Sequence, residues 1–512
     1  MYCKVNSVAL RGIDGYLVHV EADVSPGLPD FAMVGFLSSE VKEARERVRT
    51  ALRNSDFALP PKRVTVNLSP ADVRKEGTAY DLAMAISLLA GYGMLPEKSA
   101  ESAVMIGELA LNGKVCPVNG VLPRVLTARR AGLPLCFVPY ENRREGAVVE
   151  GIRVVGVRSL AEAVQLLYHP EEQQPEPCPA AEWLAAGEID GVDFAEVRGQ
   201  ETMRRAAEVA AAGMHNLLFI GSPGSGKSMI ARRIPTILPR MSREESLAVS
   251  QVYSVAGLLS EETPLIRARP FRAPHHTIST AALVGGGRVP RPGEISLADR
   301  GVLFLDELPE FQKNTLEVLR QPMEDREVHV ARVGGSCRFP ADTMVVAAMN
   351  PCRCGFYPDR SRCRCGEGEV RRYLQRISRP LLERMDLCVE APPVSYADLE
   401  SRGPGESSAV IRERVEAVRQ IQAERFAGTG IFFNSQMQAG HLREFCHLGE
   451  AESQLMEQLF ERKGLSARAY HRVLKVARTL ADMDGKAEIG RSHLLEAVSY
   501  RTMENKLWGG EG

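Results

Sequence analysis

One segment near the middle of the chain has the residue types and spacing that bind phosphate groups. The pattern G-x-x-x-x-G-K-[ST] is matched by Gly221, Ser222, Pro223, Gly224, Ser225, Gly226, Lys227 and Ser228. Glycines let the backbone fold tightly around an anion, so that N–H groups and the positive end of the following helix face the phosphates. In such a loop the lysine reaches the β- and γ-phosphates and the last hydroxyl holds Mg²⁺. The sequence therefore predicts a site for ATP and Mg²⁺.

Two acidic residues and one amide follow apolar runs and have the chemistry to complete this site. Asp306 and Glu307 come directly after the run 302–305, and Asn350 follows the run 344–349. Short apolar runs are typical of buried parallel strands whose carboxyl ends open on a ligand crevice. We expect Asp306 to contribute to the Mg²⁺ shell, Glu307 to polarise the attacking water, and Asn350 to position that water. Together with the loop, these residues predict a nucleotide hydrolase.

Four cysteines form a compact cluster directly after Asn350. Cys352 and Cys354 make one C-x-C pair, and Cys363 and Cys365 make a second pair after eight intervening residues. Four thiolates so close in sequence suit tetrahedral Zn²⁺, which would pin a segment with little apolar content of its own. The spacing departs from the usual C-x-x-C knuckle, so free reduced thiols are the alternative interpretation.

The elements that must position these residues fall into several domains. Strand-like and helix-like runs alternate around the phosphate loop, which predicts an α/β core with a parallel sheet covered on both faces. We expect an N-terminal α+β domain over 1–168, a proline- and acid-rich linker over 169–195, an ATPase core over 196–394 and a helical lid over 395–512. Strand-like 63–68 and helix-like 80–89 fall in the first domain. Segments 411–426, 450–462, 467–482 and 491–502 have helical patterns and fall in the last.

Composition narrows the class of protein. With 44% hydrophobic and 25% charged residues, the chain of 512 residues is typical of soluble globular proteins, and it is too long for one domain. No run of about 18 apolar residues predicts a membrane span. Eleven cysteines without an export signal indicate a reducing cytoplasm. The net charge of −1 means that binding to nucleic acid would depend on local basic patches.

Two such basic segments are present. Nine arginines against four acids lie between residues 353 and 384, and a predicted hairpin over 327–339 carries or adjoins Arg326, His329, Arg332 and Arg338. Either segment has the charge to attract DNA phosphates, especially when multiplied around a ring. The alternative is that these charges are paired with one another or simply solvated.

Residues 197–502 resemble an AAA+ ATPase of the magnesium-chelatase-like branch. Val197–Gln200 resembles the segment that packs near the adenine, and Leu381–Asp386 resembles the box that carries an arginine finger. The resemblance implies that Arg384 reaches the γ-phosphate of a neighbouring subunit, with Arg379 as the competing candidate. Arg468, at the start of a lid helix, resembles a second sensor that touches nucleotide as the lid closes.

The whole chain resembles the ComM/YifB family of magnesium-chelatase-like proteins. The resemblance is carried by 271–277 and 290–296, the insertion before the acidic strand, and by 304–311, the strand itself. It implies a homohexameric ATP-driven motor, a helicase that moves single-stranded or branched DNA in branch migration. A remodelling ATPase that acts on a protein partner without DNA is the alternative. We expect His275 and His276, in this insertion, to be held by ordinary hydrogen bonds rather than by a metal.

The N-terminal domain resembles the Lon-protease fold through residues 67–81 and 106–115. A Lon-type protease uses a serine activated by a lysine. Ala79 stands where the serine is expected, and Leu122 stands near the expected lysine. The resemblance therefore implies the fold without protease chemistry, and we assign this domain to assembly or substrate contact.

Overall fold

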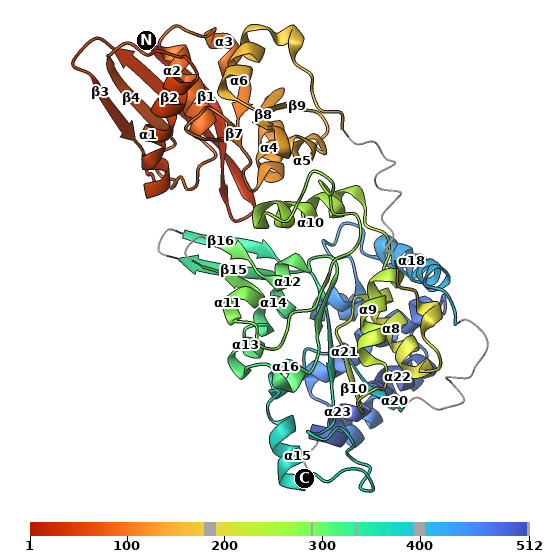
Figure 1. The fold of residues 1–512 in the computed structure, drawn as a ribbon. Helices are drawn as coiled ribbons and strands as arrows, with labels where there is room; N and C mark the ends of the chain where they lie inside the picture. Colours follow the sequence, from red (N-terminus) through yellow and green to blue (C-terminus); the bar gives the residue numbers. More distant parts are fainter. Residues whose placement is uncertain (179–190, 288–289, 333–334, 394–404, 509–512) are drawn as a thin grey trace.

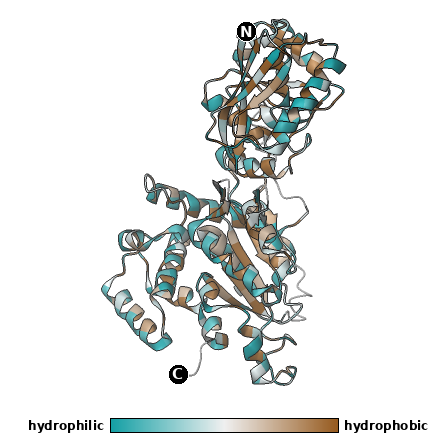
Figure 2. Cartoon of the chain, turned by 90° about the vertical axis from the view of Figure 1, so that its left-hand side faces the viewer, coloured by the Kyte–Doolittle hydropathy of each residue, from teal (hydrophilic) through white to brown (hydrophobic). Residues whose placement is uncertain are grey.

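A computed structural model describes residues 1–178, 191–287, 290–332, 335–393 and 405–508, which form two bodies (Figure 1). The first body is the N-terminal domain, and the second combines the ATPase core with the helical C-terminal region. Hydrophobic strands lie at the centre of both bodies, and polar residues lie on the helices around them (Figure 2). This arrangement confirms the α/β architecture predicted from the alternating runs.

A seven-stranded mixed sheet forms the centre of the N-terminal body, in the order β3-β4-β2-β1-β5-β8-β9. Its strands are β1 (Tyr2–Arg11), β2 (Asp14–Ser25), β3 (Asp30–Val34), β4 (Arg63–Ser69), β5 (Ala103–Met105), β8 (Leu135–Pro139) and β9 (Arg153–Val157). The helices packed with it are α1 (Ser39–Asn54), α2 (Asp81–Gly91), α3 (Glu97–Glu101), α4 (Val121–Arg130), α5 (Arg143–Ala147) and α6 (Leu160–Tyr168). The predicted strand 63–68 and helix 80–89 correspond to β4 and α2.

The two positions at which a Lon-type protease would carry its serine and lysine lie in a hydrophobic core. Ala79 and Leu122 are both buried, and they belong to the same cluster of apolar side chains as Val8 and Ile106. Neither a methyl group nor an isobutyl group can act as a nucleophile or a base. The absence of protease chemistry at these two positions therefore follows from packing as well as from residue type.

Part of the predicted linker packs on the N-terminal body. The Glu176 backbone N–H donates to Val154 O at 2.8 Å, and the Glu176 carboxylate lies 3.0 Å from the Arg143 guanidinium. Residues 179–190 lie outside the described residues. The N-terminal domain therefore keeps contact with the chain beyond its last helix.

A five-stranded parallel sheet carries the ATPase core, in the order β11-β14-β17-β10-β18. The strands are β10 (Leu217–Gly221), β11 (Phe271–Arg272), β14 (Val302–Leu305), β17 (Met344–Met349) and β18 (Leu387–Ala391). Alternate residues of β10 enter different cores: Leu217 and Phe219 face one cluster, and Leu218 and Ile220 face the other. Burial on both faces explains why these strands are apolar throughout.

Helices of the core cover both faces of this sheet (Figure 1). The longer helices of the core are α8 (Glu201–Gly213), α9 (Lys227–Ile237), α15 (Glu367–Leu374) and α10 (Arg243–Ala256), of which α10 lies against the N-terminal domain. Shorter helices are α11 (Thr280–Val284), α12 (Glu294–Leu297), α13 (Lys313–Glu317), α14 (Arg320–Asp325) and α16 (Arg379–Leu382). The helix α10 begins with a capping box in which Ser242 and Glu245 satisfy each other's backbone N–H groups, so its start is set locally.

The C-terminal region is helical, as the sequence predicts. Its helices are α18 (Ser408–Arg425), α19 (Ala439–Phe445), α20 (Glu450–Lys463), α21 (Ala467–Met483), α22 (Arg491–Ser499) and α23 (Thr502–Trp508). Side chains of α18 and α21, such as Val415 and Val473, share one hydrophobic cluster with α8 and α9. The lid therefore packs directly on the helix that follows the phosphate loop. None of the helices among the described residues has the length and apolar character to cross a membrane.

Two small hairpins extend from the core on the side of the N-terminal domain (Figure 1). One pairs β12 (Gly285–Gly286) with β13 (Arg291–Pro292), and the other pairs β15 (Glu327–Arg332) with β16 (Gly335–Pro340). The larger hairpin buries Val328 and Phe339 on one face, and it leaves the cross-strand pair His329 and Arg338 exposed. The Arg11 Nε–H donates to Ser336 O at 2.9 Å, so the N-terminal domain contacts this hairpin directly.

Candidate nucleotide-binding site

The polar strand ends predicted from the sequence meet at one edge of the parallel sheet. The phosphate loop joins β10 to α9, and Gly224 and Gly226 adopt φ angles of +78° and +83° there. Such left-handed backbone is readily available only to glycine, so these residues let the chain turn sharply into α9. Because β17 lies between β14 and β10, Asn350 stands between the acidic pair and the loop.

Lys227 is buried at the first position of α9 and is held by the loop that it serves. Its Nζ donates to Gly221 O at 2.9 Å and Ser222 O at 2.8 Å, and it lies 3.3 Å from Asn350 Oδ1. Burial lowers the pKa of Lys227, and the nearby Asp306 carboxylate acts in the opposite direction. The structure therefore brings together Lys227 and Asn350, as the sequence predicts.

Ser228 and Asp306 form the second part of the site. The Ser228 hydroxyl donates to Asp306 Oδ2 at 2.7 Å. Hydroxyl and carboxylate oxygens are the ligands that Mg²⁺ prefers, and Mg²⁺ usually takes only one or two of them from protein beside water and substrate phosphates. The donor set present here fits a magnesium ion bound beside the phosphate loop.

Glu307 points away from the buried strand into solvent. Its φ angle is +51°, and its side chain is 61% exposed. Its backbone N–H donates to Asp306 Oδ1 at 2.9 Å, which fixes the two acids relative to each other. Glu307 Oε2 also lies 3.6 Å from His276 Nδ1, a contact that the sequence analysis did not foresee.

The histidine pair of the insertion is held by ordinary contacts. His275 Nδ1 lies 2.9 Å from Thr277 Oγ1, and the His275 and His276 rings lie 4.0 Å apart. Within the described ranges, the group of side chains that could share a metal ion is the four cysteines, without either histidine. The hydrogen bond expected at this insertion is thus present at His275, with Thr277 as its partner.

Arg384 is buried within its own chain. Its Nε–H donates to Arg320 O at 2.9 Å, its Nη1 donates to Pro380 O at 2.6 Å, and its Nη2 lies 2.6 Å from Glu324. Its own carbonyl accepts a hydrogen bond from Asn216, which immediately precedes β10. An arginine finger at this position would have to leave these partners.

Arg468 lies at the same end of the sheet as Arg384. Its Nη1 donates to Glu383 Oε2 at 3.1 Å. The phosphate loop follows the opposite end of β10, a strand of five residues that spans about 16 Å. Neither arginine is therefore placed to touch nucleotide bound by its own phosphate loop.

The competing candidate, Arg379, is exposed at the start of α16. Its Nη2 donates to the Trp508 carbonyl at 3.1 Å. Its guanidinium is thus freer to reach a neighbouring molecule than that of Arg384. Both roles remain predictions.

The lid is tied to the core beside Arg384 through a buried carboxylate. Arg472 of α21 pairs with Asp386, and His215 Nδ1 lies 3.6 Å from the other carboxylate oxygen. Burial alone would raise the pKa of Asp386, but Arg472 and His215 outweigh it and hold that pKa well below its ordinary value. Asp386 is therefore an ionised anchor for the lid at neutral pH.

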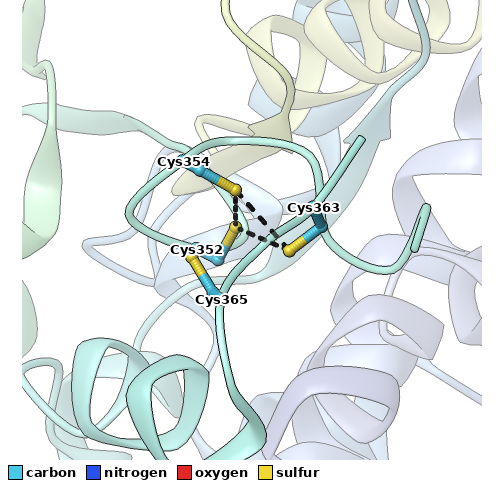
Figure 3. A group of neighbouring side chains, drawn as sticks. All are labelled: Cys352, Cys354, Cys363 and Cys365. Carbon is cyan, nitrogen blue, oxygen red and sulfur yellow. Dashed lines mark hydrogen bonds between the residues drawn. The ribbon is translucent and has the colours of Figure 1, made fainter. Parts of the chain in front are cut away.

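The four cysteines converge as their clustering in sequence suggests (Figure 3). Their sulfur atoms all lie within 4.8 Å of one another, and all four thiols are free of disulfides. Cys352 and Cys363 are buried, and Cys354 and Cys365 are half-buried. Each sulfur is thus available as a ligand.

The basic segment is largely exposed. Eight of the nine arginines between residues 353 and 384 are exposed, and Arg384 is the buried one. Some of them have acidic partners: Arg376 pairs with Glu310 at 2.9 Å, and Arg360 pairs with Glu367 at 3.5 Å. Most of the charge in this segment therefore faces solvent.

One arginine expected near the hairpin has a structural role instead. Arg326 ends α14 with a φ angle of +57° and pairs with Asp342, so it anchors the base of the hairpin. Residues 333–334, at the hairpin turn, lie outside the described residues. Among the hairpin side chains that the structure describes, Arg338 carries an exposed positive charge.

A parallel sheet of this order, with a phosphate loop, an acidic strand end and a helical lid, defines a P-loop ATPase of the AAA+ class. Family models for "Magnesium chelatase, subunit ChlI", "Subunit ChlI of Mg-chelatase" and "Magnesium chelatase, subunit ChlI C-terminal" match residues 193–399, 20–142 and 405–501. The chain belongs to the ComM/YifB family of magnesium-chelatase-like AAA+ proteins.

Its relatives support this placement. "Competence protein ComM" of Haemophilus influenzae is 41% identical over 511 residues, which cover 98% of each chain. "Uncharacterized protein YifB" of Escherichia coli is 40% identical over 505 residues, covering 98% of this chain and 97% of that protein. "Lon protease" of Trichlorobacter lovleyi is 28% identical over 187 residues, 34% of this chain and 22% of the protease. The likeness of the N-terminal region to Lon is thereby confirmed.

Proposed function

We propose that this protein is an ATP-driven motor that assembles as a homohexameric ring in the cytoplasm and moves single-stranded or branched DNA. Branch migration of recombination intermediates is the activity that the family resemblance implies. The name of the Haemophilus relative, a competence protein, is in accord with such a role. ATP is the substrate, Mg²⁺ is its cofactor, and Zn²⁺ is proposed as a structural ion at the four cysteines.

The hydrolytic roles follow from the contacts of the site. On nucleotide binding, Lys227 exchanges its loop carbonyl partners for phosphate oxygens, while Ser228 and Asp306 would hold Mg²⁺, which neutralises phosphate charge. Glu307, exposed beside the loop, accepts a proton from the attacking water. The Asn350 amide, 3.3 Å from Lys227 Nζ, positions that water without adding charge.

Assembly is supported by the separation between the phosphate loop and the arginine candidates. Arg384 and Arg468 lie at the end of the sheet opposite to their own loop, so a hydrolytic role for either requires a neighbouring subunit. A head-to-tail interface supplies that arrangement, and it closes into a ring when the rotation permits. Each site would then use the loop of one subunit and an arginine of the next.

The observation that carries the DNA assignment is the exposed positive charge near the core. It comprises the eight exposed arginines after Asn350, together with Arg338 on the larger hairpin. In a protein with a net charge of −1, such local excesses of positive charge are what would attract a polyanion. Sixfold repetition in a ring would multiply it.

A protein-remodelling ATPase is the second candidate, and the matching family descriptions favour it, since they name subunits of magnesium chelatase. The two candidates differ in their response to DNA. For a DNA motor, single-stranded or forked DNA should raise the ATPase rate, and binding should weaken steeply as salt rises because counterions are released. A remodelling ATPase should show neither effect.

The decisive experiment measures DNA-stimulated ATPase activity at two salt concentrations and the movement of a synthetic four-way junction. Replacing Arg332 and Arg338 with alanine should weaken DNA binding for all sequences alike and flatten the salt dependence. Arg462→Ala is the matched control, because this arginine is exposed on α20 of the lid. A wild-type protein that hydrolyses ATP without DNA binding at low salt would overturn the DNA assignment.

A further inference from the structure

The geometry of the four sulfur atoms fits a single tetrahedral ion. Cys352 and Cys354 lie 3.4 Å apart, Cys352 and Cys363 lie 3.8 Å apart, and Cys354 and Cys363 lie 3.5 Å apart. A zinc ion with four Zn–S bonds of about 2.3 Å places its sulfurs about 3.8 Å apart. All four sulfurs lie within 4.8 Å of one another, which leaves room for one ion and excludes a larger iron–sulfur cluster.

A backbone N–H group points at the cluster. The Tyr357 N–H donates to Cys352 Sγ at 3.4 Å. Such a hydrogen bond orients a metal ligand and stabilises a thiolate. The buried Cys352 sulfur is thus held in place by the backbone of its own loop.

The segment that carries the cysteines has no helix or strand to hold it. Between β17, which ends at Met349, and α15, which begins at Glu367, the chain forms turns and irregular structure. Irregular segments of this length are uncommon inside a compact domain unless they have a function or an added constraint. A structural metal provides such a constraint, because its binding free energy contributes to folding.

The cysteine segment lies directly against the phosphate loop. Gly355 has a φ angle of +86°, and a Cβ atom placed on it would come within 2.4 Å of Pro223 Cδ and 3.8 Å of Asn350 Cγ. Its backbone is therefore packed on Pro223, a residue of the phosphate loop. The same segment begins at Asn350, whose amide lies 3.3 Å from Lys227 Nζ. Two points of the nucleotide site thus depend on where this segment is held.

We infer that a Zn²⁺ ion bound by Cys352, Cys354, Cys363 and Cys365 braces the nucleotide site by holding Gly355 against Pro223 and Asn350 beside Lys227. The inference rests on the proposed zinc ion and on the phosphate loop as the ATP site, and it adds a coupling between them. The ion takes no part in hydrolysis. Its loss releases the segment, which loosens the phosphate loop and displaces Asn350.

Metal content, nucleotide affinity and backbone protection test this inference on the full-length protein. Protein purified without chelator should contain about one Zn²⁺ per chain by elemental mass spectrometry. The double variant Cys354→Ser, Cys365→Ser should lose the ion. Its backbone amides should exchange hydrogen faster at 350–366, the cysteine segment, and at 221–228, the phosphate loop. It should also bind a fluorescent ADP derivative roughly tenfold more weakly than the wild type. Cys116→Ser, at a half-buried cysteine of the N-terminal domain, is the matched control and should match the wild type in all three measurements.

The variant Gly355→Ala tests the contact between residue 355 and Pro223 without altering the zinc ligands. Because the added methyl group meets Pro223, this variant should keep its zinc and the hydrogen-exchange protection of the N-terminal sheet, yet lose nucleotide affinity. The double variant Gly355→Ala, Pro223→Ala should recover part of the loss relative to Pro223→Ala alone, since the clashing ring is removed. A Gly355→Ala protein with wild-type nucleotide affinity would contradict the contact on which the inference rests.

The remaining outcomes are equally decisive. A wild-type protein without zinc would contradict the proposed metal site. Zinc-free cysteine variants whose amide hydrogen exchange at 221–228 and ADP affinity match the wild type would contradict the coupling between zinc and the nucleotide site. These measurements require neither ATP hydrolysis nor DNA. A wild-type protein that holds zinc and binds ADP but fails to hydrolyse ATP would therefore contradict the proposed function while leaving the brace supported.

Discussion

Replacing Arg384 with alanine should lower both the stability of the ATPase core and the rate of ATP hydrolysis, for separate physical reasons. The side chain is buried and bonds two backbone carbonyls, those of Arg320 and Pro380, together with Glu324. Alanine leaves both carbonyls without this donor. In the assembled protein it also removes the guanidinium proposed to reach the next subunit.

The expected loss of stability follows from these contacts. A hydrogen bond from a charged donor contributes about 1.5–3 kcal/mol. The ion pair adds about 1 kcal/mol or less, because the Glu324 side chain is 48% exposed and its charge is screened. Since neighbouring contacts are not additive, we expect a total of roughly 2–4 kcal/mol. For a domain of about 150–250 residues, this loss of stability corresponds to a fall of roughly 5–15 °C in the unfolding temperature.

The assay combines thermal unfolding, ADP binding and hydrolysis below the unfolding temperature. Arg384→Ala should retain ADP affinity, because Arg384 lies at the opposite end of β10 from the phosphate loop. Its hydrolysis should be restored in part by mixing with Lys227→Ala subunits, which supply intact arginines. Arg379→Ala, at an exposed position, should unfold within about 1–2 °C of the wild type.

Two outcomes would refute this reasoning. An Arg384→Ala protein that unfolds at the wild-type temperature would contradict its role as a buried anchor. Full hydrolysis by the same protein, together with loss of hydrolysis in Arg379→Ala, would transfer the trans-acting role to Arg379.

Three further predictions concern the nucleotide site. Lys227→Ala should weaken ATP binding roughly 10- to 100-fold in equilibrium titrations, since a charged contact to phosphate is lost, and unchanged affinity would refute the phosphate-loop assignment. Glu307→Gln should bind ATP with near wild-type affinity but hydrolyse it roughly 100-fold or more slowly in single-turnover assays. Turnover at the wild-type rate would exclude Glu307 as the base. Arg468→Ala should leave the ATP affinity of the isolated subunit unchanged and should slow hydrolysis only in the assembled protein. A loss of ATP affinity in the isolated subunit would show that Arg468 contacts nucleotide bound by its own phosphate loop.

The parts of the site that the sequence predicts are those set by local patterns. The loop around Lys227 and the polar ends of two buried strands depend on short motifs, and the parallel sheet brings them together because the carboxyl ends of its strands share one edge. Ser228 therefore meets Asp306, and Lys227 meets Asn350.

Contacts between distant segments could not be predicted in this way. The burial of Arg384 against Glu324 depends on how two short helices pack, and a motif shows only that an arginine is present. The approach of Gly355 to Pro223 depends on the path of an irregular segment, for which no periodicity exists. The pairing of Arg326 with Asp342 likewise depends on which segments meet at the base of the hairpin. In each case the partner is selected by tertiary packing.

The placement of Arg384 also suggests how hydrolysis and lid movement are linked. The connection that precedes β18 carries Glu383, Arg384 and Asp386. Two arginines of the lid helix α21 form ion pairs with it: Arg468 with Glu383, and Arg472 with Asp386. Because the Asp386 pair is buried and ionised, a rotation of α21 would carry this connection with it rather than slide past it. A change in the lid, which packs on the helix after the phosphate loop, would therefore move the arginine proposed to serve the next subunit. Nucleotide in one site would thus act on its neighbour through this connection.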